Sequence, residues 1–249
     1  MDYQEISSLQ HPLVKHLVKL RQNNGYRHDQ KSVVIEGIKL LSEINQNFKA
    51  KTILTTNPRL LEKGFQADKI YVTTEDVMKK VSGMITPEGI LAEFPLPSNT
   101  SLEGMNRIIV LDSINDPGNL GTLLRTALAL GWEGVFIAGN SCDPYNEKAL
   151  RASRGACFNM PLQQGSWPEL RDLALRNSLT PLLADLKGVS PATIKAKKFM
   201  LVLSNEAHGP SKEAIAFCQR VTIPLSGEME SLNVAVAGAI LMYVLIERA

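Results

Sequence analysis

The fold is decided by one stretch near the end of the chain, Val221-Thr222-Ile223-Pro224-Leu225-Ser226-Gly227-Glu228-Met229-Glu230-Ser231-Leu232-Asn233-Val234-Ala235-Val236-Ala237. Its first three residues predict a short strand, which a proline ends, and a polar loop then leads into a helix that runs through Leu245. The helix is apolar on almost every face, and we expect such a helix to be buried. Glu230, Ser231 and Asn233 then lie at its start, where unpaired backbone N–H groups favour electron-rich ligands. This polar set is either a helix cap or part of an active site.

The composition indicates a folded enzyme, because 44% of the 249 residues are hydrophobic and 21% are charged. A net charge of +2 gives no global field that would point to nucleic acid. Cys142, Cys157 and Cys218 are widely spaced without a C-x-x-C pair, so we expect buried thiols and neither a disulfide framework nor a metal site. No signal-peptide pattern or membrane-spanning apolar run occurs in the sequence, so we expect a cytoplasmic protein without membrane contact.

Residues 1–97 predict a small α/β domain, because strand and helix patterns alternate along them. Asn23-Asn24-Gly25 predicts a turn. Pro95–Ser101 has the composition of a linker, which predicts a domain boundary near residue 97 and a second domain over 98–249. In the first domain, strands are expected at Ser32–Glu36, Thr52–Thr55, Ile70–Val72 and Gly89–Phe94, and helices at Pro12–Leu20, through Leu40 and Ile44, after Pro58, and after Thr73 or Thr74.

Basic side chains are concentrated in the first forty residues. Lys15 lies on the polar faces of the first helix, and Arg27 and Lys31 follow the predicted turn. A basic helix face is usually only solvated, but this local concentration makes Lys15, Arg27 and Lys31 candidates for RNA phosphate contact.

The second half begins with an apolar strand over Arg107–Asp112, a polar turn rich in glycine, and a helix whose apolar face ends at Gly131. A strand, a turn and a helix start suit anion binding, but the turn matches neither the dinucleotide nor the P-loop motif. Arg125 lies in the second turn of this helix, on the flank of the apolar face. It is either a surface residue or a functional one.

Polar loops follow three apolar strands, after Leu111, after Leu203 and after Ile223. In an open parallel sheet this edge binds ligands. Further elements are expected as strands at Gly134–Gly139, Pro181–Asp185 and Phe199–Leu203, and as helices at Glu147–Ser153, after Pro168 and after Ser211. We predict only a short connecting segment between the helix at Glu147–Ser153 and Pro161.

These loops resemble the SpoU, or TrmH, class of SPOUT RNA methyltransferases. The resemblance rests on three motifs in the expected order, which are Asn119-Leu120-Gly121-Thr122-Leu123-Leu124-Arg125-Thr126-Ala127, Leu203-Ser204-Asn205-Glu206-Ala207-His208-Gly209, and Ile223-Pro224-Leu225 with Glu230-Ser231-Leu232-Asn233-Val234-Ala235-Val236-Ala237. The first domain is similar to the substrate-binding domain of the ribosomal-RNA branch through Ile6-Ser7-Ser8, Lys15, Arg27, Glu36-Gly37 and Thr86-Pro87-Glu88-Gly89.

The resemblance implies a SPOUT domain, in which a parallel sheet of an α/β fold has its C-terminal segment threaded as a trefoil knot. It also implies a homodimer that transfers a methyl group from S-adenosylmethionine to a ribose 2′-hydroxyl of RNA, with ribosomal RNA favoured over transfer RNA. The catalytic residues implied are Asn119, Arg125, Glu206, Ser231 and Asn233, and the cofactor-binding residues are Ser204, Gly209, Ile223 and Leu232. Ser204 and Ala207 replace the glycines that the family usually has, which predicts weaker cofactor binding.

Three alternatives stay open at this point. Glu206 could form a salt bridge that only holds its loop, and Ser231 could merely cap the last helix. The chain could also be an RNA-binding protein without activity. A hydrolase built on His208 and Ser231 is disfavoured, because the sequence has no G-x-S-x-G motif and no assigned acid.

Overall fold

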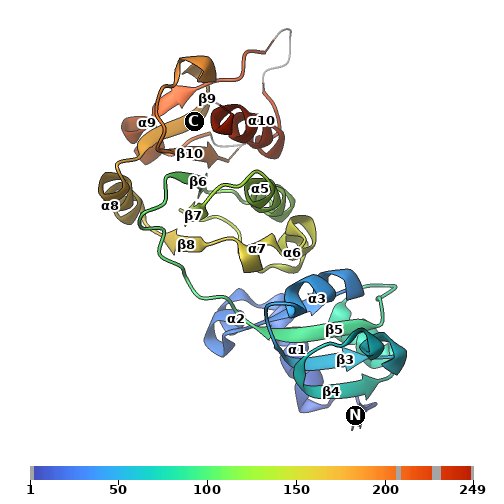
Figure 1. Ribbon diagram of the computed structural model, residues 1–249. Coiled ribbons are helices and arrows are strands. Elements are labelled where there is room, and N and C mark those ends of the chain that lie inside the picture. Colours follow the sequence, from blue (N-terminus) through green and yellow to red (C-terminus); the bar gives the residue numbers. More distant parts are fainter. Residues whose placement is uncertain (1–2, 206–208, 226–230, 248–249) are drawn as a thin grey trace. The chain divides into compact units, whose positions relative to one another are not determined.

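The computed structural model describes residues 3–205, 209–225 and 231–247. The chain divides into two compact units, of which the first comprises Met1–Ser98 with Tyr145–Glu147 and the second Asn99–Pro144 with Lys148–Ala249. Both units combine a β-sheet with helices, so the predicted α/β class is confirmed (Figure 1). None of the helices in the described ranges is long and apolar enough to cross a membrane.

The first unit contains a five-stranded mixed sheet with the strand order β1-β4-β3-β5-β2. Strands β1 and β3 run parallel to β4, whereas β5 runs antiparallel to both β2 and β3. The strands are β1 (Gln4–Ile6), β2 (Ser32–Glu36), β3 (Ala50–Thr55), β4 (Ala67–Thr73) and β5 (Ile90–Pro95). The helices are α1 (Pro12–Gln22), α2 (Asn24–Gln30), α3 (Ile38–Asn45), the 3₁₀ helix η1 (Pro58–Lys63) and α4 (Glu75–Ser82).

Helices α1 and α4 build one core of this unit. Their apolar side chains pack with Leu54 and Leu91 of the sheet, because both helices place hydrophobic residues at helical spacing on one face. The turn predicted at Asn23-Asn24-Gly25 is wrong. The side chain of Asn23 accepts a hydrogen bond from the N–H of Tyr26 at 2.8 Å, and this cap starts α2 instead.

The second unit contains a six-stranded parallel sheet with the order β11-β9-β10-β6-β7-β8. The strands are β6 (Arg107–Asp112), β7 (Gly134–Ala138), β8 (Leu162–Gly165), β9 (Thr180–Val189), β10 (Phe199–Ser204) and β11 (Gln219–Val221). The helices are α5 (Pro117–Ala129), α6 (Glu147–Ser153), α7 (Ala156–Asn159), α8 (Trp167–Asn177), the 3₁₀ helix η2 (Pro191–Thr193), α9 (Lys212–Phe217) and α10 (Val234–Ile246). The predicted parallel sheet is confirmed, but α7 and β8 were not predicted.

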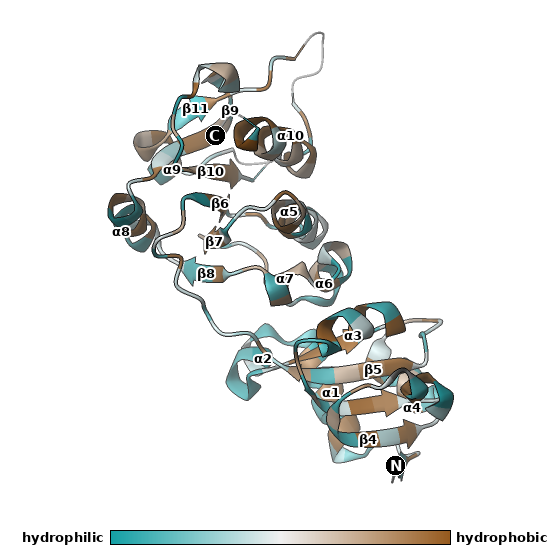
Figure 2. Cartoon of the chain, viewed as in Figure 1, coloured by the Kyte–Doolittle hydropathy of each residue, from teal (hydrophilic) through white to brown (hydrophobic). Residues whose placement is uncertain are grey.

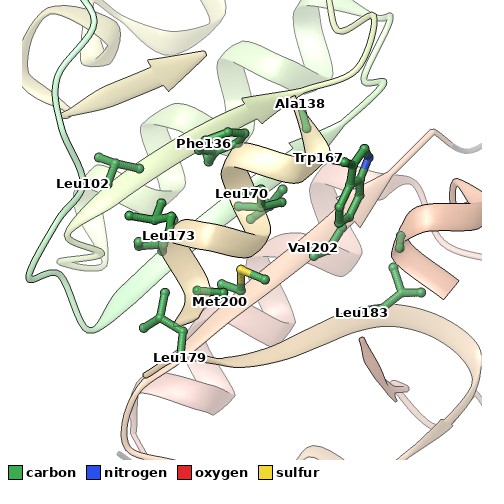
Figure 3. Packing of buried hydrophobic residues seen from close by; sticks show 14 residues of the cluster. Leu102, Phe136, Ala138, Trp167, Leu170, Leu173, Leu179, Leu183, Met200 and Val202 are labelled. Carbon is green, nitrogen blue, oxygen red and sulfur yellow. The ribbon is translucent and has the colours of Figure 1, made fainter. Parts of the chain in front are cut away.

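Helices cover both faces of this parallel sheet. Figure 1 shows α8 and α9 on one side and α5 and α10 on the other. The α8 side is packed by Trp167, Leu170 and Leu173 against alternate residues of the central strands, including Phe136 and Met200 (Figure 3). Burial on both faces explains why the central strands read as continuous apolar runs.

The last helix, α10, is less enclosed than its sequence predicts. It packs on α5 and β10 through a buried face that includes Gly238 and Leu241. Val236, Ile240 and Tyr243 form an outer stripe and are 49%, 39% and 51% exposed, although the helix is hydrophobic along its length (Figure 2). The sheet covers only one side of an outer-layer helix, so the expectation of burial on every face is wrong for the single chain.

Candidate functional site

A cavity of about 510 Å³ lies at the carboxyl ends of β9, β10 and β11. Its volume falls within the range of about 300–1,000 Å³ that is usual for small-molecule sites. The cavity is lined by all four residues predicted to bind the cofactor, Ser204, Gly209, Ile223 and Leu232, and by Ser231. The structure thus brings together residues that lie on separate loops of the sequence.

Asp112 connects two of these loops at the end of β6. Its side chain is buried, with an exposed fraction of 1%. The hydroxyl of Ser204 donates to Oδ2 of Asp112 at 3.5 Å, and the backbone N–H of Ser211 donates to the same oxygen at 3.3 Å. Nδ2 of Asn205 also donates to the carbonyl of Ser113 at 3.0 Å. The hydroxyl that replaces the usual glycine therefore has a partner at the end of β6.

Asn119 and Asn233 join the first and third motifs. Nδ2 of Asn233 donates to Oδ1 of Asn119 at 3.1 Å. Oδ1 of Asn233 also accepts from the N–H groups of Ala235 and Val236, at 2.9 and 3.3 Å, and so caps α10. Asn119 is held in turn at the start of α5, where its N–H donates to Oδ1 of Asp116 at 2.7 Å. One side chain therefore fixes a helix start and connects it to a second helix.

Arg125 is an exposed residue of α5 and does not belong to the side chains that line the cavity. Exposure leaves its guanidinium accessible to a macromolecular ligand. Glu206 lies outside the described residues, as do Glu230 and His208. The predicted pairing of Glu206 with Arg125 therefore stays a prediction.

The three residues predicted to contact RNA differ in burial. Lys15 on α1 and Lys31 after α2 are exposed. Arg27 is only 3% exposed, and its Nη1 donates to the carbonyls of Leu20 and Arg21 at 2.8 and 3.0 Å. The guanidinium of Arg27 thus holds the C-terminal end of α1, where cations satisfy free carbonyls. In this structure Arg27 is engaged with α1, and its contact with phosphate stays a prediction.

The cysteine thiols stay protonated at neutral pH. All three are free, and Cys157 is buried, whereas Cys142 and Cys218 are half-buried. Burial raises the pKa of Cys157 and of Cys218 to about 12 and that of Cys142 to about 11, and nearby carboxylates act in the same direction. In the described part of the chain, no group of three or more His, Cys, Asp or Glu side chains is placed to hold a metal ion.

The sequence interpretation missed three polar residues of this site. Asp112 had a detectable signal, because it is an acid at the end of an otherwise apolar buried strand. Asp185 on β9 and Arg220 on β11 line the cavity itself, whereas Asp112 lies behind Ser204. Their sequence positions carry no such signal, because β9 and β11 become neighbours only in the folded sheet.

Comparison with known families agrees with this geometry. Residues 106–243, more than half of the chain, match the model of the SpoU rRNA Methylase family. Residues 11–92 match the MRM3-like substrate binding domain.

Individual relatives match nearly the whole chain. A 23S rRNA (guanosine(2553)-2′-O)-methyltransferase of Bacillus subtilis is 31% identical over 247 residues, covering 96% of this chain and 98% of the relative. Among solved structures, an rRNA methyltransferase of Sinorhizobium meliloti with bound AdoMet is 26% identical at a TM-score of 0.86 and covers 98% of both chains. A TrmH-family putative RNA methyltransferase of Porphyromonas gingivalis is 30% identical at a TM-score of 0.86, covering 97% of this chain and 100% of that one. The chain belongs to the SpoU rRNA methylase family.

Proposed function

We propose that this protein transfers a methyl group from S-adenosylmethionine to a ribose 2′-hydroxyl of ribosomal RNA. The observation that carries the proposal is the cavity at the carboxyl edge of the parallel sheet. It is lined by Ser204, Ile223 and Leu232. Ser231 lines the cavity as well, and Asn233, two residues further along the chain, donates a hydrogen bond to Asn119 of the first motif. The similarity to the B. subtilis 23S rRNA 2′-O-methyltransferase supports the same reaction.

The residues of the cavity fit S-adenosylmethionine. Much of the wall is apolar, with Leu203, Val234 and Leu241 among its side chains, and suits an adenine ring. Polar and charged side chains also reach the cavity and suit the ionic part of the cofactor. When bound, the cofactor supplies an electrophilic methyl group on a sulfonium. Backbone and side-chain atoms of Ser204, Gly209, Ile223 and Leu232 would hold it.

The protein must then hold the hydroxyl oxygen, the methyl carbon and the sulfur in line while the hydroxyl proton passes to a base, either an RNA phosphate or water. It must also stabilise the negative charge that loss of this proton develops on the oxygen. Arg125 is suited to this role, because a guanidinium stays protonated and presents several N–H donors in a fixed plane. Asn119 at the start of α5 and Asn233 at the start of α10 are hydrogen-bonded to each other and would orient the nucleotide. Glu206 and Ser231 would complete the set of catalytic residues.

We assign RNA binding to the first domain, residues 1–97, and catalysis to the second, residues 98–249. Lys15 and Lys31 are exposed and carry the charge that phosphate contact needs. The match of residues 11–92 to a substrate-binding domain supports this division.

A homodimer would cover the outer stripe of α10. Val236, Ile240 and Tyr243 recur at helical spacing on that face, so a second copy of the chain could bury them together. Ile240→Glu should convert a dimer into a monomer in sedimentation, because the stripe would then carry a charge. An unchanged dimer would place the interface elsewhere. We further infer that the C-terminal segment of the chain is threaded as the trefoil knot typical of SPOUT proteins, and that the enzyme acts on ribosomal RNA in the cytoplasm.

The RNA class is tested by incubating the purified protein with labelled S-adenosylmethionine and with ribosomal or transfer RNA from cells that lack the enzyme. The proposal predicts label in 23S ribosomal RNA and background in transfer RNA. Label in transfer RNA alone would favour the alternative substrate. Tight RNA binding without any transfer would favour an inactive RNA-binding protein.

A further inference from the structure

One end of the cavity carries charged side chains from two neighbouring strands. Asp185 and Lys187 lie on β9, and Arg220 lies on β11. Oδ1 of Asp185 accepts from the backbone N–H of Lys187 at 2.7 Å, which fixes the carboxylate in place. The Asp185 side chain is only 14% exposed, and that of Arg220 is 36% exposed.

The charges of Asp185 and Arg220 are only partly satisfied by each other. Nε of Arg220 lies 3.9 Å from Oδ2 of Asp185, which is an ion pair but too long for a hydrogen bond. Within the described ranges, the Arg220 guanidinium makes no hydrogen bond to protein. A partly desolvated guanidinium without hydrogen bonds favours a ligand that accepts them, and a carboxylate held by one N–H can accept further hydrogen bonds. The pair therefore presents an anion and a planar cation next to each other in a cavity.

We infer that Asp185 and Arg220 hold the α-amino-acid group of S-adenosylmethionine, an inference that rests on the proposed function. Among the groups of this cofactor, only the amino-acid end carries an ammonium and a carboxylate side by side. The ammonium donates to Oδ2 of Asp185, and the carboxylate accepts from the guanidinium of Arg220. The neutral adenosine then occupies the apolar part of the cavity around Leu203 and Ile223.

The inference is tested by calorimetry with two ligands that share the thioether-linked adenosine and differ in the amino-acid chain. S-adenosylhomocysteine keeps the amino-acid group, whereas 5′-methylthioadenosine lacks it and keeps the adenosine and the sulfur. Arg220→Gln and Asp185→Asn should each weaken S-adenosylhomocysteine by about tenfold or more, because a hydrogen bond between charged groups is lost. Binding of 5′-methylthioadenosine should change by less than about twofold in both variants.

Arg176→Gln is the matched control, because Arg176 is an exposed arginine of the same unit that pairs with Glu103 and does not line the cavity. Unfolding midpoints of all variants establish that the folded protein is being titrated. Unchanged affinity of Arg220→Gln for S-adenosylhomocysteine would overturn the inference. An equal loss for both ligands in Asp185→Asn would overturn it too, and would place Asp185 at the ribose hydroxyls. If the unmodified protein binds neither ligand, the proposed function itself fails.

Discussion

Asn233 donates a hydrogen bond from Nδ2 to Oδ1 of Asn119 at 3.1 Å, across 114 positions of sequence. Its own Oδ1 accepts from two N–H groups of α10. The start of the last helix and the first turn of α5 are therefore held together by one amide. Position 233 therefore serves both helix capping and loop positioning, and the choice of substitution separates the two effects.

Replacing Asn233 by serine should separate them. A serine is a good N-cap but is too short to reach Asn119, so the free energy of unfolding should stay within about 0.5 kcal/mol of the unmodified protein. Methyl transfer should fall about tenfold through loss of the cross-link. Asn233→Ala loses the cap as well, so its free energy of unfolding in urea should be lower by about a further 1 kcal/mol. If Asn233→Ser keeps the full rate, the hydrogen bond does not position the site.

Replacing Arg125 by alanine should reduce methyl transfer by about a hundredfold or more, because a preorganised donor at the developing charge is lost. The affinity for S-adenosylhomocysteine should not change, since Arg125 does not line the cavity. Unfolding should change by less than about 0.5 kcal/mol because the side chain is exposed. Single-turnover rates and calorimetry measure the two effects. Arg176→Ala is the control, and a loss of cofactor affinity in Arg125→Ala would contradict the assigned role.

Gly121 allows α5 to pack closely on α6. A Cβ atom at this position would lie 2.5 Å from the carbonyl of Ala149 and 2.9 Å from the backbone nitrogen of Ser153. Backbone atoms of a packed helix cannot rotate away as a side chain can. Gly121→Ala should therefore destabilise the protein by about 1–3 kcal/mol, although alanine favours helices. Gly25→Ala in α2 is the control, because its nearest neighbour is the Asn23 side chain at 3.4 Å. Denaturation curves should show Gly25→Ala at or above the stability of the parent protein.

The thiols should be unreactive at pH 8, since the pKa of Cys142 is raised to about 11 and those of Cys157 and Cys218 to about 12. Ellman's reagent should titrate three thiols only after unfolding. In the unfolded chain a thiol ionises near its ordinary pKa of 9.0. Below pH 9 the thiols are protonated in both states, and their contribution to the free energy of unfolding is fully present. This stability should be lost as the pH rises from about 9 toward 12. Rapid labelling of the folded protein at pH 8 would disagree with the burial described.

Hydrophobic periodicity predicted the regular elements closely. The predicted bounds of β2 and α6 are those of the structure, because each has a clear apolar pattern between breakers. β8 was missed, since Leu162–Gly165 is a polar strand at the edge of the sheet and contains no β-branched residue. β11 ends at Val221, two residues before the predicted end at Ile223, where the chain leaves the sheet to line the cavity.

For the candidate site, the sequence predicted part of the cavity lining but not the burial of Arg27 or the pairing of Asp185 with Arg220. Motif order placed Ser204, Gly209, Ile223 and Leu232 in one site, and the cavity brings them together. Burial of Arg27 could not be predicted, because a cation that caps the end of a helix has the same sequence pattern as one on a basic surface. The pairing of Asp185 with Arg220 depends on the register of β9 and β11, which local pattern does not contain.

The central claim, methyl transfer to a ribose hydroxyl, is tested most directly by the chemical position of the transferred group. Ribosomal RNA from cells that lack the enzyme is incubated with the purified protein and methyl-labelled S-adenosylmethionine, then digested to nucleosides and analysed by mass spectrometry. The proposed reaction predicts label in a single 2′-O-methylnucleoside, whose linkage resists alkali, and an initial rate of labelling about a hundredfold lower with Arg125→Ala. Label on a base, or no label with the unmodified protein, would contradict it.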